Sequence, residues 1–296
     1  MFHKNLRINK ILWVLLIALL SAVLALNYAV GMDFHVPNAP QFLGIMAICF
    51  GISLGYRHTG RNDAMVLFGH TVNQFIVSAF ILSVLEFTLM LMHFPMVDAA
   101  IIRTELALGI DWRALVAAST RSPAVALLLQ LAYNWLVPML MLAICVLFAT
   151  RRVSHAQRLL IAYLVSGIAC IVIAALLPTM GAYSYYHYDP FTSLYPDPVR
   201  TYLDEAAQID ALRSHRLREV SFPNIGLVFF PSFHAAGALL LIYAAWPVRG
   251  LKWAYLAACG VMFLSLPFAG GHYVTDIIAG LLIALAGIAL AKRCVV

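Results

Sequence analysis

Residues 267–291 read PFAGGHYVTDIIAGLLIALAGIALA, a run that is long and apolar enough to cross a lipid bilayer as a helix. Two side chains near its start, His272 and Asp276, can carry a charge, and they lie four residues apart. Insertion scales put the cost of an ionisable side chain at the centre of a membrane helix at about 2.5–3.5 kcal/mol, so such residues indicate function by default. The run therefore predicts a membrane-spanning helix with a functional site at its start.

The whole chain has the same apolar character. Of its 296 residues, 63% are hydrophobic and 11% are charged, and the mean hydropathy is +0.90. A soluble domain carries about 25% charged residues, so the composition excludes that class. We predict an all-α integral membrane protein with about eight transmembrane helices. The expected spans lie near residues 11–31, 40–56, 65–93, 123–148, 159–180, 226–248, 251–270 and 273–291.

The basic residues are divided unequally between the two faces of this arrangement. With eight spans, both termini lie on one face, and that face receives Lys4, Arg7, Lys10, Arg57, Arg61, Arg151, Arg152, Arg158, Arg249, Lys252, Lys292 and Arg293. Cytoplasmic loops carry an excess of lysine and arginine. We therefore expect a multi-pass protein of the plasma or inner membrane with cytoplasmic termini and extracytoplasmic loops at 94–122 and 181–225. The net charge of +6 then reflects topology, and we expect no nucleic-acid partner.

Three further features bear on organisation. The first apolar run is longer than the 7–15 residues of a signal peptide, so it predicts an anchor. The charged loop 94–122 suits short amphipathic helices at the membrane interface, which we interpret as a structural collar, with a substrate-guiding role as the less favoured alternative. Residues 199–220 have the pattern of another amphipathic helix.

The five cysteines do not form a recognisable site. Cys49, Cys145, Cys170 and Cys259 lie within apolar spans, and Cys294 lies in the tail. The sequence contains no C-x-x-C pair and no Cys/His cluster, so it supports neither a disulfide framework nor a zinc site. We expect these thiols to be inert and the protein to need no metal or cofactor.

A second span begins with ionisable residues on the same side of the membrane. Residues 226–246 read GLVFFPSFHAAGALLLIYAAW, which places Ser232 and His234 near the depth of His272 and Asp276. In a helix, residues at positions i and i+4 share a face, so the Asp276 carboxylate can accept the imidazole N–H of His272 and fix its tautomer.

This set of groups suits phosphoryl transfer. The other ring nitrogen of His272 can act as a nucleophile, and His234 can act as a general acid toward a leaving oxygen. Ser232 and the N–H groups at the start of its helix can hold an anion. The residues therefore predict a phosphohistidine intermediate.

The two stretches carry a family resemblance. PSFHAAG and, about forty residues later, GGHYVTDIIAG resemble the second and third motifs of the type-2 phosphatidic acid phosphatase superfamily, PSGH and SR-x5-H-x3-D. The variant is most similar to the branch with inositol phosphorylceramide synthases, where H-Y-x-x-D is typical. The resemblance implies a six-helix core within 61–296, preceded by two anchoring helices within 1–60. It also implies a metal-independent reaction.

The resemblance assigns roles to individual residues. His272 would be the nucleophile, Asp276 its orienting partner, His234 the acid and Ser232 a phosphate ligand. The chain departs from the family pattern at its basic positions, because Leu266 replaces the arginine of the third motif. In the first motif, Leu177 stands before Pro178 and Cys170 occupies the lysine position. Other cations must then stabilise the phosphoryl group. The candidates, which an ordinary solvated helix face explains equally well, are Arg200, Arg213, Arg216 and Arg218.

Several alternatives follow from these residues. The leading hypothesis is an integral-membrane enzyme acting on a lipid with a phosphate or phospho-head group, either as a phosphatase or as a phosphotransferase. A catalytically inactive scaffold is the alternative, and a transporter is less favoured because no inverted repeat is visible. The other intramembrane polar residues, His70, Glu86, Asn73 and Asn134, suit packing and interhelical hydrogen bonds. The acceptor, the lipid and the oligomeric state stay open.

Overall fold

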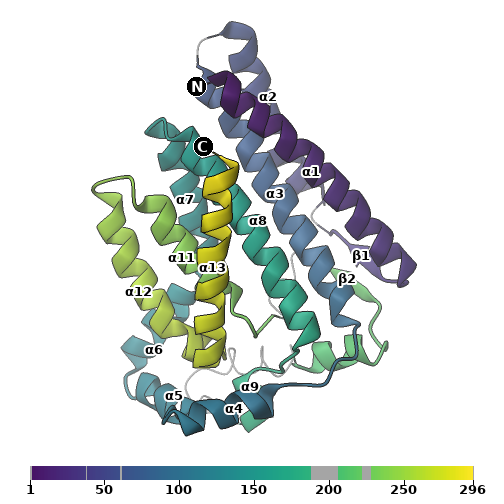
Figure 1. Ribbon diagram of the computed structural model, residues 1–296, viewed down its shortest axis with the longest axis vertical. Helices are drawn as coiled ribbons and strands as arrows, with labels where there is room; N and C mark the ends of the chain where they lie inside the picture. Colours follow the sequence, from purple (N-terminus) through teal and green to yellow (C-terminus); the bar gives the residue numbers. More distant parts are fainter. Residues whose placement is uncertain (1, 38, 61, 188–205, 222–227, 296) are drawn as a thin grey trace.

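A computed structural model describes residues 2–37, 39–60, 62–187, 206–221 and 228–295 (Figure 1). Its helices are α1 (Phe2–Ala29), α2 (Ala39–Thr59), α3 (Asp63–Met90), α4 (Asp98–Ala107), α5 (Trp112–Thr120), α6 (Pro123–Tyr133), α7 (Leu136–Ala149), α8 (Val153–Leu176), α9 (Ala182–Tyr186), α11 (Phe233–Ala245), α12 (Leu251–Ala269) and α13 (Val274–Cys294). Residues 206–213 are also helical, within the amphipathic helix predicted over 199–220, whose first residues lie outside the described part.

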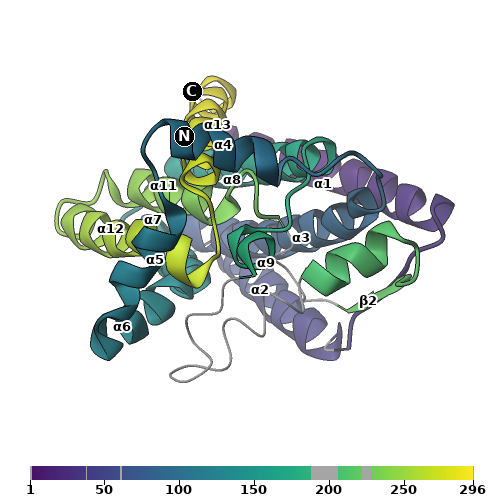
Figure 2. The same cartoon turned by 90° about the horizontal axis from the view of Figure 1, so that it is seen from below.

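The long helices form one bundle with two distinct ends. Both chain termini and the start of α3 lie at one end, which we call the termini end. The short helices α4, α5 and α9 lie across the other, which we call the short-helix end (Figures 1 and 2). Helices α4 and α5 occupy loop 94–122, where the sequence predicts short helices.

Six helices among the described residues are long and apolar enough to cross a membrane: α1, α2, α3, α8, α12 and α13. The shortest of them has 19 residues, which at 1.5 Å per residue is close to the ~30 Å thickness of the hydrocarbon core. The prediction of an all-α multi-pass membrane protein is therefore confirmed.

Two predicted spans differ from single long helices. The span expected over 123–148 is divided into α6 and α7 at Asn134 and Trp135. Pro138 has no N–H to donate to the carbonyl of Asn134, so a continuous helix would lose a hydrogen bond there and meet the proline ring. The span expected over 226–248 contains α11, which has 13 residues because it begins only after its N-cap, Ser232.

Small and polar residues bring the long helices into close contact. A Cβ atom added at Gly69 would lie 2.1 Å from the Cys49 carbonyl oxygen, so only glycine lets α2 and α3 approach this closely. Asn73 of α3 donates a hydrogen bond to the Met46 carbonyl of α2 at 3.1 Å, which is the interhelical role expected for it. Asn134 instead donates within its own helix, to the Gln130 carbonyl.

The expected packing role of His70 also agrees with its contacts, because its Nδ1 accepts a hydrogen bond from Trp13 Nε1 at 3.3 Å. Glu86 is buried within α3.

A two-stranded parallel pair links distant parts of the chain. Strand β1 (Asp33–His35) follows α1, and β2 (Glu219–Ser221) precedes the segment that leads to α11. Asp33 pairs with Glu219, and His35 pairs with Ser221. The connection between α1 and α2 is thereby fastened to the chain that carries the second motif.

Candidate active site

The second and third motifs meet at the short-helix end of the bundle. The backbone N–H of Ser232, just before α11, donates to the Asp276 carbonyl of α13 at 3.0 Å. A Cβ atom added at Gly280 would lie 2.2 Å from the Ser232 carbonyl oxygen, so the glycine permits this close approach. Ser232, His272 and Asp276 are all buried. Two segments about forty residues apart in sequence therefore share one site.

The two histidines lie near each other. Their ring centroids are 6.5 Å apart with an interplanar angle of 49°. The His234 ring stacks on Tyr133, at the end of α6, with centroids 4.1 Å apart. Gly270 makes room for this arrangement, because a Cβ there would lie 2.6 Å from the His272 ring and 2.7 Å from the Tyr133 ring.

A backbone carbonyl orients the His272 ring. Nδ1 of His272 lies 3.0 Å from the Phe229 carbonyl oxygen, which can only accept a hydrogen bond. Nδ1 therefore carries the proton, and Nε2 presents its lone pair. Asp276 Oδ2 lies 3.5 Å from the same Nδ1, beyond ordinary hydrogen-bond length.

The Asp276 carboxylate thus has a different first partner from the one expected. Its Oδ2 accepts from the backbone N–H of Tyr273 at 2.9 Å, as part of a capping box at the start of α13. Its Oδ1 is buried and has no hydrogen-bond partner among the described residues. The Asp276 carboxyl group therefore lies close to His272, while the Phe229 carbonyl accepts the hydrogen bond from the imidazole.

Burial also affects the charge of His272, which lies in the turn between α12 and α13. Burial and, to a smaller extent, the neighbouring His234 lower the pKa of His272 below the usual value for histidine, and the hydrogen bond with Phe229 opposes this shift. The imidazole is therefore neutral at physiological pH, as a nucleophile requires.

Ser232 begins α11 as its N-cap. Its Oγ accepts from the backbone N–H of Ala235 at 3.2 Å. A serine hydroxyl that accepts one hydrogen bond still has a proton to donate. Ser232 can therefore cap the helix and donate to an anion at the positive end of α11.

Three of the four candidate arginines contact other parts of the chain. Arg213 donates to the Met92 and Phe94 carbonyls at 2.9 and 2.5 Å, and Arg216 pairs with Asp210. The guanidinium of Arg218 lies beside Gly31. Arg200 lies outside the described residues.

At the family's basic positions the structure is apolar. Leu266 and Cys170 are fully buried, and Leu177 ends α8 as its C-cap.

Aromatic residues that sequence reasoning missed enclose the His272 turn. Trp112, the first residue of α5, donates from Nε1 to the His272 carbonyl at 3.0 Å. The Trp112 ring meets Tyr183 edge-on at 4.9 Å and stacks on Tyr186 at 5.7 Å. The guanidinium of Arg113 lies 5.2 Å from the centre of the Tyr186 ring. The available signal was the amphipathic pattern of loop 94–122, which we interpreted as a structural collar.

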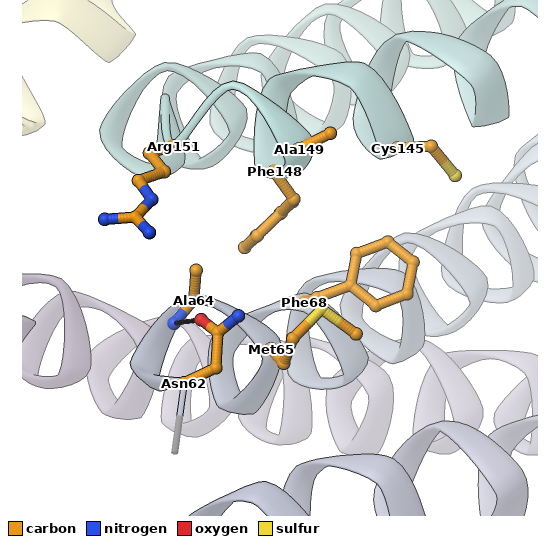
Figure 3. A pocket seen from close by; sticks show the side chains of 8 residues that line it. All are labelled: Asn62, Ala64, Met65, Phe68, Cys145, Phe148, Ala149 and Arg151. Carbon is orange, nitrogen blue, oxygen red and sulfur yellow. Dashed lines mark hydrogen bonds between the residues drawn. The ribbon is translucent and has the colours of Figure 1, made fainter. Parts of the chain in front are cut away.

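A separate cavity of about 310 Å³ lies at the termini end, between the start of α3 and the end of α7 (Figure 3). Its lining combines the polar side chains of Asn62 and Arg151 with the apolar side chains of Met65, Phe68 and Phe148. It contains none of the predicted site residues. Among the described residues, no group of three or more histidine, cysteine or acidic side chains could hold a metal ion.

Comparison with known proteins agrees with the motifs. The family model of the PAP2 superfamily matches residues 99–290, about two thirds of the chain, and this range includes all four predicted site residues. No curated protein and no solved structure gives a significant match. The range runs from α4 to α13 and leaves α1, α2 and α3 outside. The chain belongs to the PAP2 superfamily.

Proposed function

We propose that this protein is a membrane enzyme that transfers a phosphoryl or phospho-head group from a lipid through a phosphohistidine at His272. Members of the PAP2 superfamily are generally phosphatases and phosphotransferases, which supports a phosphoesterase-type lipid enzyme. The observation that carries the proposal is the orientation of His272 by the Phe229 carbonyl, which occupies Nδ1 and directs the lone pair of Nε2 away from that bond. The ring centre of His234 lies 6.5 Å from that of His272.

The reaction has two balanced steps. In the first, Nε2 of His272 attacks phosphorus and the bond to the lipid oxygen breaks. His234, which takes up a proton when the anionic lipid binds, gives that proton to the leaving oxygen. In the second, neutral His234 removes a proton from an acceptor hydroxyl, which attacks phosphorus and releases His272. The Asp276 carboxylate stabilises the positive charge on the phosphorylated imidazole, and Ser232 binds a phosphoryl oxygen. These steps need no metal or cofactor.

The charge balance of the site supports a phospho-head-group transferase of the inositol phosphorylceramide synthase type. A phosphomonoester carries up to two negative charges near neutral pH, and a phosphodiester carries one. The site has the buried Leu266 where the family pattern has arginine, so it offers less compensation for a second negative charge. The H-Y-x-x-D form of the third motif supports the same branch, with a sphingolipid alcohol as acceptor.

The distribution of lysine and arginine between the two faces also suggests on which side of the membrane the site lies. We propose that the termini are cytoplasmic and that the short-helix end, with the site, faces the extracytoplasmic side of the plasma or inner membrane. Residues 1–60 would then anchor a catalytic core formed by residues 61–296.

The test uses purified protein in lipid vesicles with a panel of phosphomonoester and phosphodiester lipids, each with and without a lipid alcohol. Free phosphate and new phospholipid are measured together. We expect His272→Ala and His234→Ala to lower turnover by about 10³-fold or more and about 10²–10⁴-fold respectively. His70→Ala is the matched control, because His70 contacts Trp13 rather than either motif.

The products then assign the reaction. New phospholipid that requires the alcohol supports the transferase, whereas free phosphate from a monoester supports the phosphatase. Equal background for the wild type and all three variants would instead favour the inactive scaffold.

A further inference from the structure

Helix α4 carries two buried acids although it lies outside the long spanning helices. Asp98 and Glu105 are seven residues apart, which is close to two helical turns, so they share one face. Each has 2% of its surface exposed. Aspartate and glutamate are almost never this buried without partners, so their contacts indicate what the helix holds.

Asp98 connects the end of α8 with the third motif. Its Oδ1 and Oδ2 both lie 3.1 Å from the backbone N–H of Met180, which donates to them. Oδ1 also accepts from the Tyr273 hydroxyl at 3.0 Å. One carboxylate therefore fixes the residue that directly follows His272.

Glu105 holds the other side of the same turn. Its Oε1 accepts from the Thr275 backbone N–H at 2.6 Å and from the Thr275 hydroxyl at 2.9 Å. The first N–H groups of a helix have no partner within that helix. Glu105 therefore caps α13 from outside, next to the internal cap that Asp276 provides.

The turn needs such external contacts because its own backbone is permissive. Gly270 and Gly271 precede His272, and Gly271 has a φ of +60°, in the region that favours glycine. A catalytic group that moves by about 1 Å can lose on the order of a hundredfold in rate. The position of the His272 ring thus depends on what grips Tyr273 and Thr275.

We propose that Asp98 and Glu105 are positioning residues that hold the turn over residues 270–276 in its reactive geometry, so that α4 belongs to the catalytic apparatus. This inference rests on the proposed function of His272. Neither acid is placed against the substrate, so each acts through hydrogen bonds to the turn.

The test compares variants that lose the acceptor with variants that keep it. Glu105→Ala and Asp98→Ala should lower kcat about 10–100-fold while KM stays within threefold. Glu105→Gln and Asp98→Asn retain a carbonyl oxygen and should keep kcat within about fivefold of the wild type. Asp210→Ala is the control, because Asp210 is an exposed acid paired with Arg216.

A second readout does not depend on turnover. Amide hydrogen exchange of residues 270–277 should accelerate at least tenfold in both alanine variants and stay unchanged in Asp210→Ala. Unchanged exchange would overturn the inference whether or not the protein shows turnover. Faster exchange with normal kcat, or a raised KM with normal kcat, would also overturn it. Normal turnover in His272→Ala would contradict the proposed function. The exchange measurement would still decide whether α4 holds the turn.

Discussion

The two ends of the bundle differ in what converges on them. The termini end has the cavity of about 310 Å³, lined by both polar and apolar side chains (Figure 3). The short-helix end has the buried His272, Asp276 and Ser232. Trp112 of α5 and the Phe229 carbonyl before α11 bind His272, and α4 binds the neighbouring Tyr273 and Thr275. The comparison teaches that the predicted site residues lie where buried polar groups converge, and that the open cavity lies elsewhere.

The sharpest test of this difference uses one glycine at each end. Gly280→Ala would place a methyl group 2.2 Å from the Ser232 carbonyl oxygen, and Gly69→Ala would place one 2.1 Å from the Cys49 carbonyl oxygen. Overpacking of this kind costs about 1–3 kcal/mol of stability, so both should lower the midpoint of thermal unfolding. We expect Gly280→Ala to lower turnover per folded molecule about a hundredfold, because it separates the two motifs.

Gly69→Ala should leave turnover per folded molecule within threefold of the wild type. Gly260→Ala serves as the control for both, since nothing lies within 4 Å of a Cβ atom added there. An equal loss of turnover in Gly280→Ala and Gly69→Ala would mean that the two ends of the bundle are coupled. The distinction between the two ends would then not hold.

Two tryptophans offer a second pair, Trp112 at the start of α5 and Trp13 within α1. Trp112→Phe keeps an aromatic ring against Tyr183 but removes the N–H that donates to the His272 carbonyl. A buried group left without its partner costs about 1–3 kcal/mol, so we expect turnover to fall about tenfold. Trp13→Phe removes a similar N–H, which donates to His70, and should change turnover less than twofold. Steady-state kinetics on both variants decides this, and a normal rate in Trp112→Phe would remove α5 from the site.

The smallest effects are expected at the arginines of the loop before α11. Arg213 is held by the Met92 and Phe94 carbonyls, and Arg216 is held by Asp210. We expect Arg213→Ala, Arg216→Ala and Arg218→Ala each to change kcat/KM less than threefold. A loss of a hundredfold in any of them would show that its side chain moves to the phosphoryl group when substrate binds.

The sequence allowed six of the eight expected spans and the meeting of the two motifs to be predicted, because apolar length and intramembrane ionisable residues are properties of single segments. It did not reveal the Phe229 carbonyl as the partner of His272, since a backbone oxygen has no residue type to recognise. The role of α4 was hidden for another reason. Asp98 and Tyr273 are 175 residues apart, so their contact exists only after the bundle has formed.

One difference had a visible cause. The division between α6 and α7 follows from Pro138, which lies within the apolar run that predicted one span. A proline five residues after the end of α6 removes the hydrogen bond that would continue the helix. The four predicted site residues lie close together, and their chemical roles stay predictions until the variants are measured.

The pairing of β1 with β2 has a consequence for biosynthesis. Asp33 leaves the ribosome long before its partner Glu219 is made. At about 5–20 residues per second, the interval between them is about 10–40 s. Strand β1 therefore has no partner while most of the chain is being made, and β2 can pair with it only after α3 to α9 have been synthesised. Assembly of the site is in this way a late event in the life of each new chain.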